Sequence, residues 1–173
     1  MTENDGRPKV VYTTMKKKNT DDETKQIARR MAAECLAVRI RFMGRVITSL
    51  YDQAQKNLDI TINQANILVF LILHPGASPG AIGRALQMEK STVSRSLDRM
   101  KKKEWIEVAP GNARGALGVR ATAGGNQLLA SLWHEWQKTQ EEMQELMGNE
   151  GNMAVHTIFN ILKQKGYGKG IDL

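Results

Sequence analysis

The sequence is poor in the features that mark secreted and membrane-spanning proteins. The 173 residues include a single cysteine, Cys35, so an intramolecular disulfide is excluded and a reducing compartment is favoured. The longest uninterrupted apolar run covers residues 67–73, far short of the ~20 residues that span a bilayer. The first residues also lack the apolar core of a signal peptide. We therefore expect a cytoplasmic protein.

Sequence signals for catalysis and for cofactor binding are missing as well. The three histidines, His74, His134 and His156, are scattered and do not have metal-ligand spacing. The chain contains no nucleophile motif and no phosphate-binding glycine loop. Aromatic residues make up only 5% of the chain, too few for a platform that stacks single-stranded bases. We expect neither an enzyme nor a resident metal or cofactor.

Positive charge, in contrast, is plentiful and unevenly distributed. The formal net charge is +7. Between Arg84 and Arg120, nine Lys and Arg residues face four Asp and Glu residues, so a charge of +5 lies in this short segment. A basic segment of this kind favours a polyanionic partner.

The basic segment has the pattern of a helix-turn-helix followed by a hairpin. A short helix opens at Ser78, which suits an N-cap and is followed by a proline. A turn at 87–89 leads into a second helix over 90–103. A β-type segment at 105–108 then returns through 119–121 after a loop rich in turn residues. This order predicts a winged helix-turn-helix, a shape that places one helix in a DNA groove.

The second helix has an apolar face and a polar face. Val93, Leu97 and Met100 recur at helical spacing and should point into the domain. Short hydroxyl side chains near the start of the polar face would let the first turn approach base edges, and cations follow them. The predicted DNA-binding residues of this helix are Lys90, Ser91, Thr92, Ser94, Arg95, Arg99 and Lys102.

The role of each cation stays open at this point. Arg95 can pair with a guanine edge or contact a phosphate. Residues 101–103, three lysines in a row, are phosphate contacts or solvated cations. In the loop between the two strands, Arg114 sits on a turn-rich tip at 110–115, where it could enter the minor groove or remain solvated.

A long N-terminal helix is predicted from Asp21 to about Lys56, because acidic residues suit its start and no proline interrupts it. It carries an apolar stripe wider than a surface helix needs. The stripe consists of one line of residues, Ile27, Met31, Cys35, Val38, Phe42, Val46 and Leu50, and a second line alongside it, Leu36, Ile40, Met43 and Ile47. We infer that the stripe packs against a partner chain; a wholly intramolecular core is the alternative.

Three further helices are indicated outside the helix-turn-helix. Thr61 and Gln64 have the spacing of a capping box and open an apolar helix that ends at 74–76. Thr122 caps another helix with an apolar stripe, which a break at 148–152 separates from a last helix.

These signals give a mainly α fold, a winged helix-turn-helix with long flanking N- and C-terminal dimerisation helices. The predicted parts are a flexible N-terminal arm (1–20), a dimerisation helix (21–57), a winged helix-turn-helix DNA-binding domain (58–121), C-terminal dimerisation helices (122–166) and a tail (167–173). The arm contains three lysines at 16–18, which either touch phosphates or only solubilise the chain.

The order of these motifs resembles the MarR (multiple-antibiotic-resistance regulator) family of dimeric winged-helix transcription factors. The resemblance covers residues 58–146 by motif and the outer helices by layout. Matching residues are Ile60-Thr61-x-x-Gln64, His74-Pro75-Gly76, Ser91-Thr92-Val93-Ser94-Arg95, Leu97-Asp98-Arg99, Trp105-Ile106-Glu107, Arg114 and Thr122-x-x-Gly125. The resemblance implies a bacterial homodimer that binds a pseudo-palindromic double-stranded DNA operator, usually as a repressor.

The sequence departs from the family pattern at three positions. Glu104 stands where the family usually has a helix-ending glycine, so this helix end is expected to close differently. Asn112 replaces an aspartate in the wing and removes a possible ion pair. Ala121 replaces a leucine and thins an apolar contact before Thr122.

The resemblance also implies candidate modes of regulation. Many relatives release DNA when small aromatic or phenolic acids bind beside the dimer helices, and Phe42, Arg45, Trp133 and Trp136 are candidate pocket residues; simple packing is the alternative for the tryptophans. Some relatives sense oxidants through a cysteine in the first helix, which makes Cys35 a candidate redox site or an inert core residue. A further alternative is an architectural or adaptor DNA-binding dimer that responds to no effector.

Overall fold

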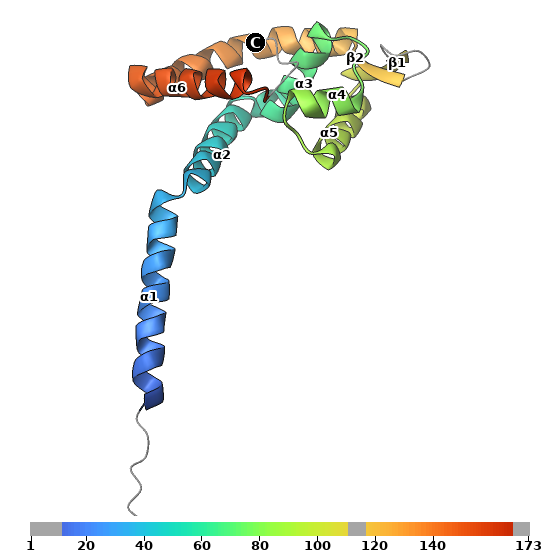
Figure 1. Ribbon diagram of the computed structural model, residues 1–173. Helices are drawn as coiled ribbons and strands as arrows, with labels where there is room; N and C mark the ends of the chain where they lie inside the picture. The colour runs from blue at the N-terminus through green and yellow to red at the C-terminus, as the bar shows by residue number, and fades with distance from the viewer. Residues whose placement is uncertain (1–11, 111–116, 168–173) are drawn as a thin grey trace, which may run out of the picture. The chain divides into compact units, whose positions relative to one another are not determined.

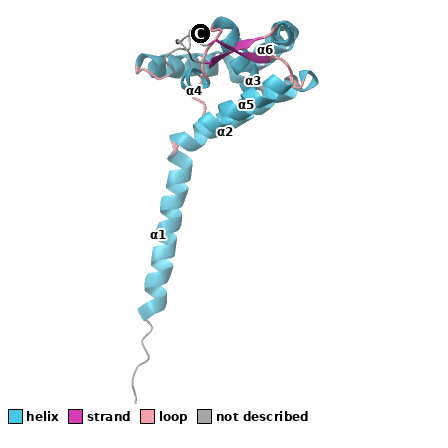
Figure 2. Cartoon of the chain, turned by 90° about the vertical axis from the view of Figure 1, so that its right-hand side faces the viewer, coloured by secondary structure: helices cyan, strands magenta, loops and turns pink. Residues whose placement is uncertain are grey.

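The computed structural model describes residues 12–110 and 117–167, and these residues form helices and a single two-stranded sheet (Figures 1 and 2). The chain divides into two compact units, residues 1–45 and 46–173. In chain order the elements are α1 (Tyr12–Glu34), α2 (Leu36–Ala54), the 3-10 helix η1 (Lys56–Leu58), α3 (Ile62–Leu73), α4 (Pro79–Ala85), α5 (Lys90–Lys102), β1 (Ile106–Pro110), β2 (Leu117–Ala121) and α6 (Ala123–Gln164).

The first unit corrects the prediction of one long helix from Asp21. Two helices, α1 and α2, meet at Cys35, and the first begins at Tyr12. The acidic residues at 21–23 therefore lie inside α1 rather than at its start, and residues 12–20 of the predicted flexible arm are helical.

A side chain takes part in the break between α1 and α2. The backbone N–H of Cys35 still donates to the Met31 carbonyl at 3.0 Å, but Arg39 donates from Nη2 to the Ala33 carbonyl at 2.5 Å. The guanidinium thus supplies a donor to a carbonyl in the last turn of α1, where a helix end leaves backbone acceptors without partners. The apolar stripe on either side of the break is exposed in the single chain.

The second unit is built around α3, whose apolar residues are buried on nearly every side. Ile67, Leu68 and Leu71 are fully buried. The predicted capping box is confirmed: Thr61 Oγ1 accepts from the Gln64 N–H at 3.3 Å, and Gln64 Oε1 accepts from the Thr61 N–H at 3.1 Å. These two bonds satisfy N–H groups that the start of a helix leaves without partners.

The last turns of α2 belong to the second unit and form hydrogen bonds with two of its other helices. Asp52 Oδ1 accepts from the Ile62 N–H at 2.6 Å and so holds the start of α3. The Tyr51 hydroxyl donates to Gln140 Oε1 on α6 at 2.6 Å. Burial raises the pKa of Tyr51, which keeps this hydroxyl protonated as a donor.

The helix-turn-helix follows α3 as predicted. Ser78 caps α4 by accepting from the Ala81 N–H at 3.2 Å. In the turn, Gln87 adopts a left-handed φ of 52° and donates from Nε2 to the Arg84 carbonyl at 2.8 Å, which closes the end of α4. On α5 the predicted inward face is confirmed, because Val93, Leu97 and Met100 are its buried residues.

The end of α5 corrects the expectation drawn from Glu104. This residue takes the left-handed conformation, with φ 58°, that a glycine usually takes. The Trp105 N–H donates to the Met100 carbonyl at 3.0 Å and the Glu104 N–H to the Lys101 carbonyl at 3.0 Å. These are the two bonds of a Schellman motif, so the helix closes in the usual way despite the cost of a side chain at this φ.

The hairpin is antiparallel and is joined to the core of the second unit. Its register runs from Ile106 opposite Ala121 to Pro110 opposite Leu117. Val119 of β2 also pairs with Ala77, in the connection between α3 and α4. Residues 111–116, which include Asn112 and Arg114, lie outside the described residues. Ala121 is partly buried against the core.

Helix α6 starts close against the base of the hairpin and contains a kink. Thr122 Oγ1 accepts from the Gly125 N–H at 3.1 Å and donates to the Glu104 carbonyl at 2.5 Å. A Cβ on Gly125 would overlap the Trp105 carbonyl oxygen, so glycine permits this close approach.

The predicted break in the C-terminal region is confirmed at Gly148, which has φ 62° and ψ −179° inside α6. The Asn152 amide donates to the carbonyls of Gln144 at 2.9 Å and Gly148 at 2.8 Å. Figure 1 shows the chain changing direction here, between the orange and red parts of α6. Across residues 12–110 and 117–167, none of the helices combines the length and the apolar character needed to cross a bilayer.

Candidate nucleic-acid interface

The polar face of α5 is free of structural contacts along most of its length. Lys90, Ser91, Ser94, Arg95, Arg99 and Lys102 are exposed, and Thr92 is half-buried. The N-cap residue Glu89 makes no side-chain cap hydrogen bond, so the first turn of α5 keeps backbone donors for a ligand. Donors at a helix start, followed by cations, suit a negatively charged backbone that crosses this face.

Arg95 lies back along its own helix. Its Nε donates to the Ser91 carbonyl at 3.2 Å, which leaves the two terminal nitrogens of the guanidinium for other acceptors. These two nitrogens are the pair that a guanine edge or a phosphate engages bidentately. The geometry is therefore compatible with either of the roles predicted for Arg95.

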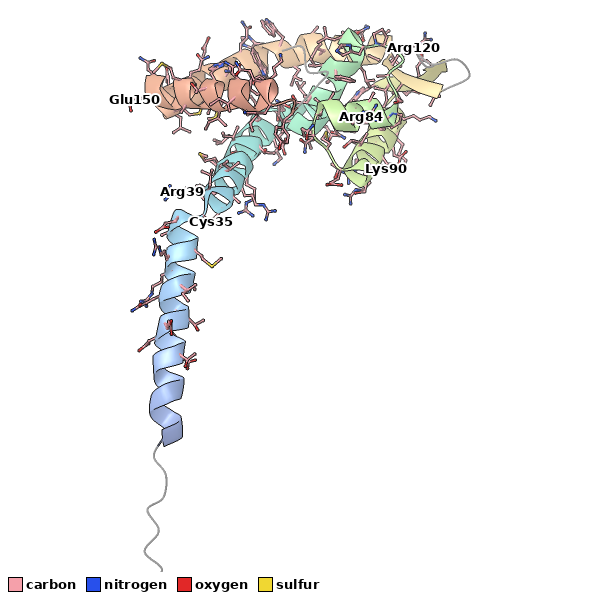
Figure 3. The ribbon with its side chains drawn as sticks, in the orientation of Figure 1. Cys35, Arg39, Arg84, Lys90, Arg120 and Glu150 are labelled. Carbon is pink, nitrogen blue, oxygen red and sulfur yellow. The ribbon has the colours of Figure 1, made fainter. Side chains whose placement is uncertain are left out.

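Two exposed arginines outside α5 were missed by the sequence reasoning. Figure 3 shows Arg84 on α4, Lys90 at the start of α5 and Arg120 on β2. Three elements of the winged unit, the name used here for residues 58–121, therefore carry a cation. Arg120 Nε pairs with Glu107 Oε1 across the hairpin at 2.7 Å. Such exposed pairs add little stability, so Arg120 can exchange Glu107 for another anion at low cost. The basic count between Arg84 and Arg120 was the only sequence signal for these residues.

A hollow of about 400 Å³ lies between α4 and the start of α5. Arg84 and Lys90 are its two cations, Glu89 is its one carboxylate, and Gly80 and Gly83 also line it. A Cβ on Gly83 would approach the Met88 carbonyl to 3.1 Å, so this glycine lets α4 and the turn pack closely. The hollow places two cations next to the uncapped start of α5, which is a suitable contact for a phosphate backbone.

The predicted effector residues are distributed over both units. Phe42 and Arg45 belong to the first unit and are exposed. Trp133 and Trp136 belong to the second unit, where their rings stack with centroids 5.3 Å apart. Trp133 remains 56% exposed, so packing within this chain does not account for its position. The effector pocket stays a prediction.

Cys35 is half-buried at the junction of α1 and α2. The alternative to redox sensing, an inert core cysteine, would require fuller burial than Cys35 has. The redox role stays a prediction. Among the residues that the structure describes, there is no group of three or more His, Cys, Asp or Glu residues that could hold a metal ion.

The sequence of the winged unit matches a known family. Residues 58–115 match the model of the MarR family. The match runs from just before α3 into the loop after β1, and so includes both helices of the helix-turn-helix. The predicted resemblance to this family is therefore confirmed. None of the curated proteins matches the chain by sequence.

The fold is also shared with solved structures. M. tuberculosis transcriptional regulator MosR is 20% identical with a TM-score of 0.68, over 78% of this chain and 98% of that protein. A mutant E. coli MarR complexed with operator DNA is 22% identical with a TM-score of 0.65, over 78% of this chain and 95% of that protein. S. aureus MepR in its DNA complex is 20% identical with a TM-score of 0.63, over 75% of this chain and 95% of that protein. At these identities the likeness shows the fold, which confirms the predicted mainly α winged helix-turn-helix.

Proposed function

We propose, from the match of residues 58–115 to the MarR family, that this protein is a transcriptional regulator that binds double-stranded DNA. Helix α5 enters the major groove, and the wing contacts the adjacent minor groove through Arg114. The observation that carries the proposal is the division of α5 into a buried apolar face and an exposed face of hydroxyls and cations.

The proposal includes a homodimer that represses by occupying a pseudo-palindromic operator. Exposed apolar side chains on α1 and α2 support a second copy, since water contact with such a stripe is unfavourable. A two-fold dimer would present two copies of α5, about one helical turn of DNA apart or a multiple of it. S. aureus MepR and the E. coli MarR mutant are seen in complex with DNA, which supports the same partner for this chain.

The test begins with selection of bound duplexes from a random pool, followed by footprinting. We expect a protected site of roughly 15–20 bp with two-fold symmetry. Binding whose affinity ignores sequence would instead support an architectural dimer and would overturn the regulator assignment.

Arg95→Ala then separates base reading from phosphate contact. If Arg95 reads a base, its loss costs about 1–3 kcal/mol and relaxes specificity at one position of the operator. Lys101→Ala, which removes the same charge from the same helix, is the matched control and should weaken all sequences alike. Unchanged affinity in both Arg95→Ala and Arg114→Ala at fixed salt would contradict the assigned interface.

We further propose that a small aromatic or phenolic acid acts as an effector. The exposed Trp133 ring, stacked on Trp136, offers an aromatic surface to such a ligand. Tryptophan fluorescence should change on titration with a phenolic acid, and the same acid should release operator DNA. If tryptophan fluorescence does not change with any phenolic acid tested, this mode of regulation is contradicted.

A further inference from the structure

A second hollow, of about 430 Å³, lies between the start of α3, the 3-10 helix η1 and the later turns of α5. Six charged residues line it, four of them cations. Its volume is in the range that holds small ligands. The residues that form this hollow come from two segments about 40 positions apart in the chain, so no local sequence pattern indicates it.

Both carboxylates of the hollow already have partners within the fold. Asp52 Oδ1 accepts from the Ile62 N–H at 2.6 Å. Asp59 Oδ2 accepts from Lys103 Nζ at 2.5 Å, and the same ammonium lies 4.4 Å from the centre of the Trp105 ring. Asp52, Asp59 and Lys103 therefore have structural roles in the walls of the hollow. Of the four cations, Lys103 is already paired with a carboxylate.

The other three cations are uncommitted. Within the described residues, Lys56, Arg99 and Lys102 take part in no ion pair. Because they converge on one hollow from η1 and α5, they repel one another in the empty site and favour a ligand with more than one negative charge.

A buried amide adds a neutral donor. Gln64 is only 4% exposed and lines the hollow. Its Oε1 is held by the Thr61 N–H, and no hydrogen bond among the described residues uses its Nε2. This Nε2 is not one of the buried side-chain atoms that lack a partner, so it is open to solvent and can donate to a ligand in the hollow.

We propose that this hollow is a phosphate-binding site. Arg99 engages two phosphate oxygens, Lys56 and Lys102 supply the remaining charge, and the Gln64 amide donates a hydrogen bond. The four cations and two carboxylates of the hollow sum to a charge of +2, so a monocarboxylate would leave half of this charge without a counter-ion. The phosphate belongs either to a small phosphorylated molecule or to the DNA backbone, and in the second case the site rests on the proposed DNA binding.

The experiment compares Lys56→Gln with Lys101→Gln in the full-length protein. Each substitution removes one exposed lysine charge, but Lys101 does not line the hollow. Thermal unfolding checks that both variants fold. Calorimetric titration with pyrophosphate, without DNA, then measures binding of a free phosphate ligand. If that is the source, Lys56→Gln should weaken pyrophosphate binding roughly tenfold while Lys101→Gln leaves it nearly unchanged.

The second arm measures affinity for the selected operator over a series of salt concentrations. If the phosphate comes from DNA, pyrophosphate does not bind and Lys56→Gln lowers operator affinity, with a salt slope reduced by about one. Lys101→Gln is the control for the pyrophosphate arm alone, because Lys101 lies on the helix assigned to DNA. If Lys56→Gln leaves pyrophosphate binding, operator affinity and the salt slope unchanged, the hollow is not a phosphate site. The pyrophosphate arm does not depend on DNA binding, so failure of the regulator assignment would be seen separately.

Discussion

The winged unit and the first unit bury their apolar side chains to opposite extents. On α3, Ile67, Leu68 and Leu71 are 0% exposed. On α1 and α2, Met31 is 68% exposed and Phe42 is 62% exposed, although both are as apolar as the residues of the core. The winged unit completes its core within one chain, whereas the stripe of the first unit needs another surface to leave water. The exposed stripe of the first unit is the feature that the proposed second copy of the chain would cover.

Two glycine-to-alanine substitutions give the largest expected contrast. Gly125→Ala forces a Cβ against the Trp105 carbonyl oxygen and should lower the free energy of unfolding by about 3 kcal/mol or more. Gly44→Ala adds a Cβ to α2 with no atom within 4 Å and should raise it by about 0.5–1 kcal/mol. Urea denaturation of both variants measures the two effects.

The Gly44→Ala variant also tests whether the surface of α2 around Gly44 is open in solution. A loss of stability or of self-association in Gly44→Ala would mean that a second chain packs directly against Gly44. An unchanged urea-denaturation curve for Gly125→Ala would contradict the close approach between the hairpin and α6.

Phe42→Asp should give the next largest effect, because it places a charge in the exposed stripe. If a second copy covers the stripe, each protomer loses roughly 2–3 kcal/mol of association free energy, and sedimentation should show monomers at concentrations where the parent protein is a dimer. Val108→Asp is the control, since Val108 on β1 is 50% exposed but belongs to the winged unit. If Phe42→Asp and Val108→Asp dissociate the dimer equally, the exposed stripe of the first unit is not the surface that holds two chains together.

Glu104→Gly should give the smallest effect. It relieves a side chain at φ 58° and keeps both bonds of the Schellman motif, so the free energy of unfolding should rise by about 1 kcal/mol. Gln87→Gly relieves a similar φ of 52° but loses the bond to the Arg84 carbonyl, so its gain should be smaller. A gain that changes with protein concentration would argue that the winged unit is not complete within one chain.

The sequence predicted the elements that local chemistry determines. The capping box at Thr61, the cap at Ser78 and the inward face through Val93 all follow from short spacings, and the structure confirms them. The break at Gly148 was also readable, because glycine clusters interrupt helices.

Features that depend on distant contacts were missed or mistaken. No proline or glycine marks the junction at Cys35, where Arg39 bonds to the Ala33 carbonyl. Glu104 was expected to alter the end of α5, but the carbonyl of Glu104 is held by Thr122, 18 residues away. The hollow that includes Lys56, Gln64 and Arg99 exists only after α3 and α5 pack together.

The free outward face of α5 has a consequence for how such a protein changes its target. Ser91, Ser94 and Arg95 make no contact with the core, while Val93, Leu97 and Met100 hold the helix in place. Residues on the outer face can therefore be exchanged without loss of folding. If α5 reads DNA as proposed, selection can retarget the same scaffold to a new operator through a few surface substitutions, and an engineered exchange of these side chains should do the same.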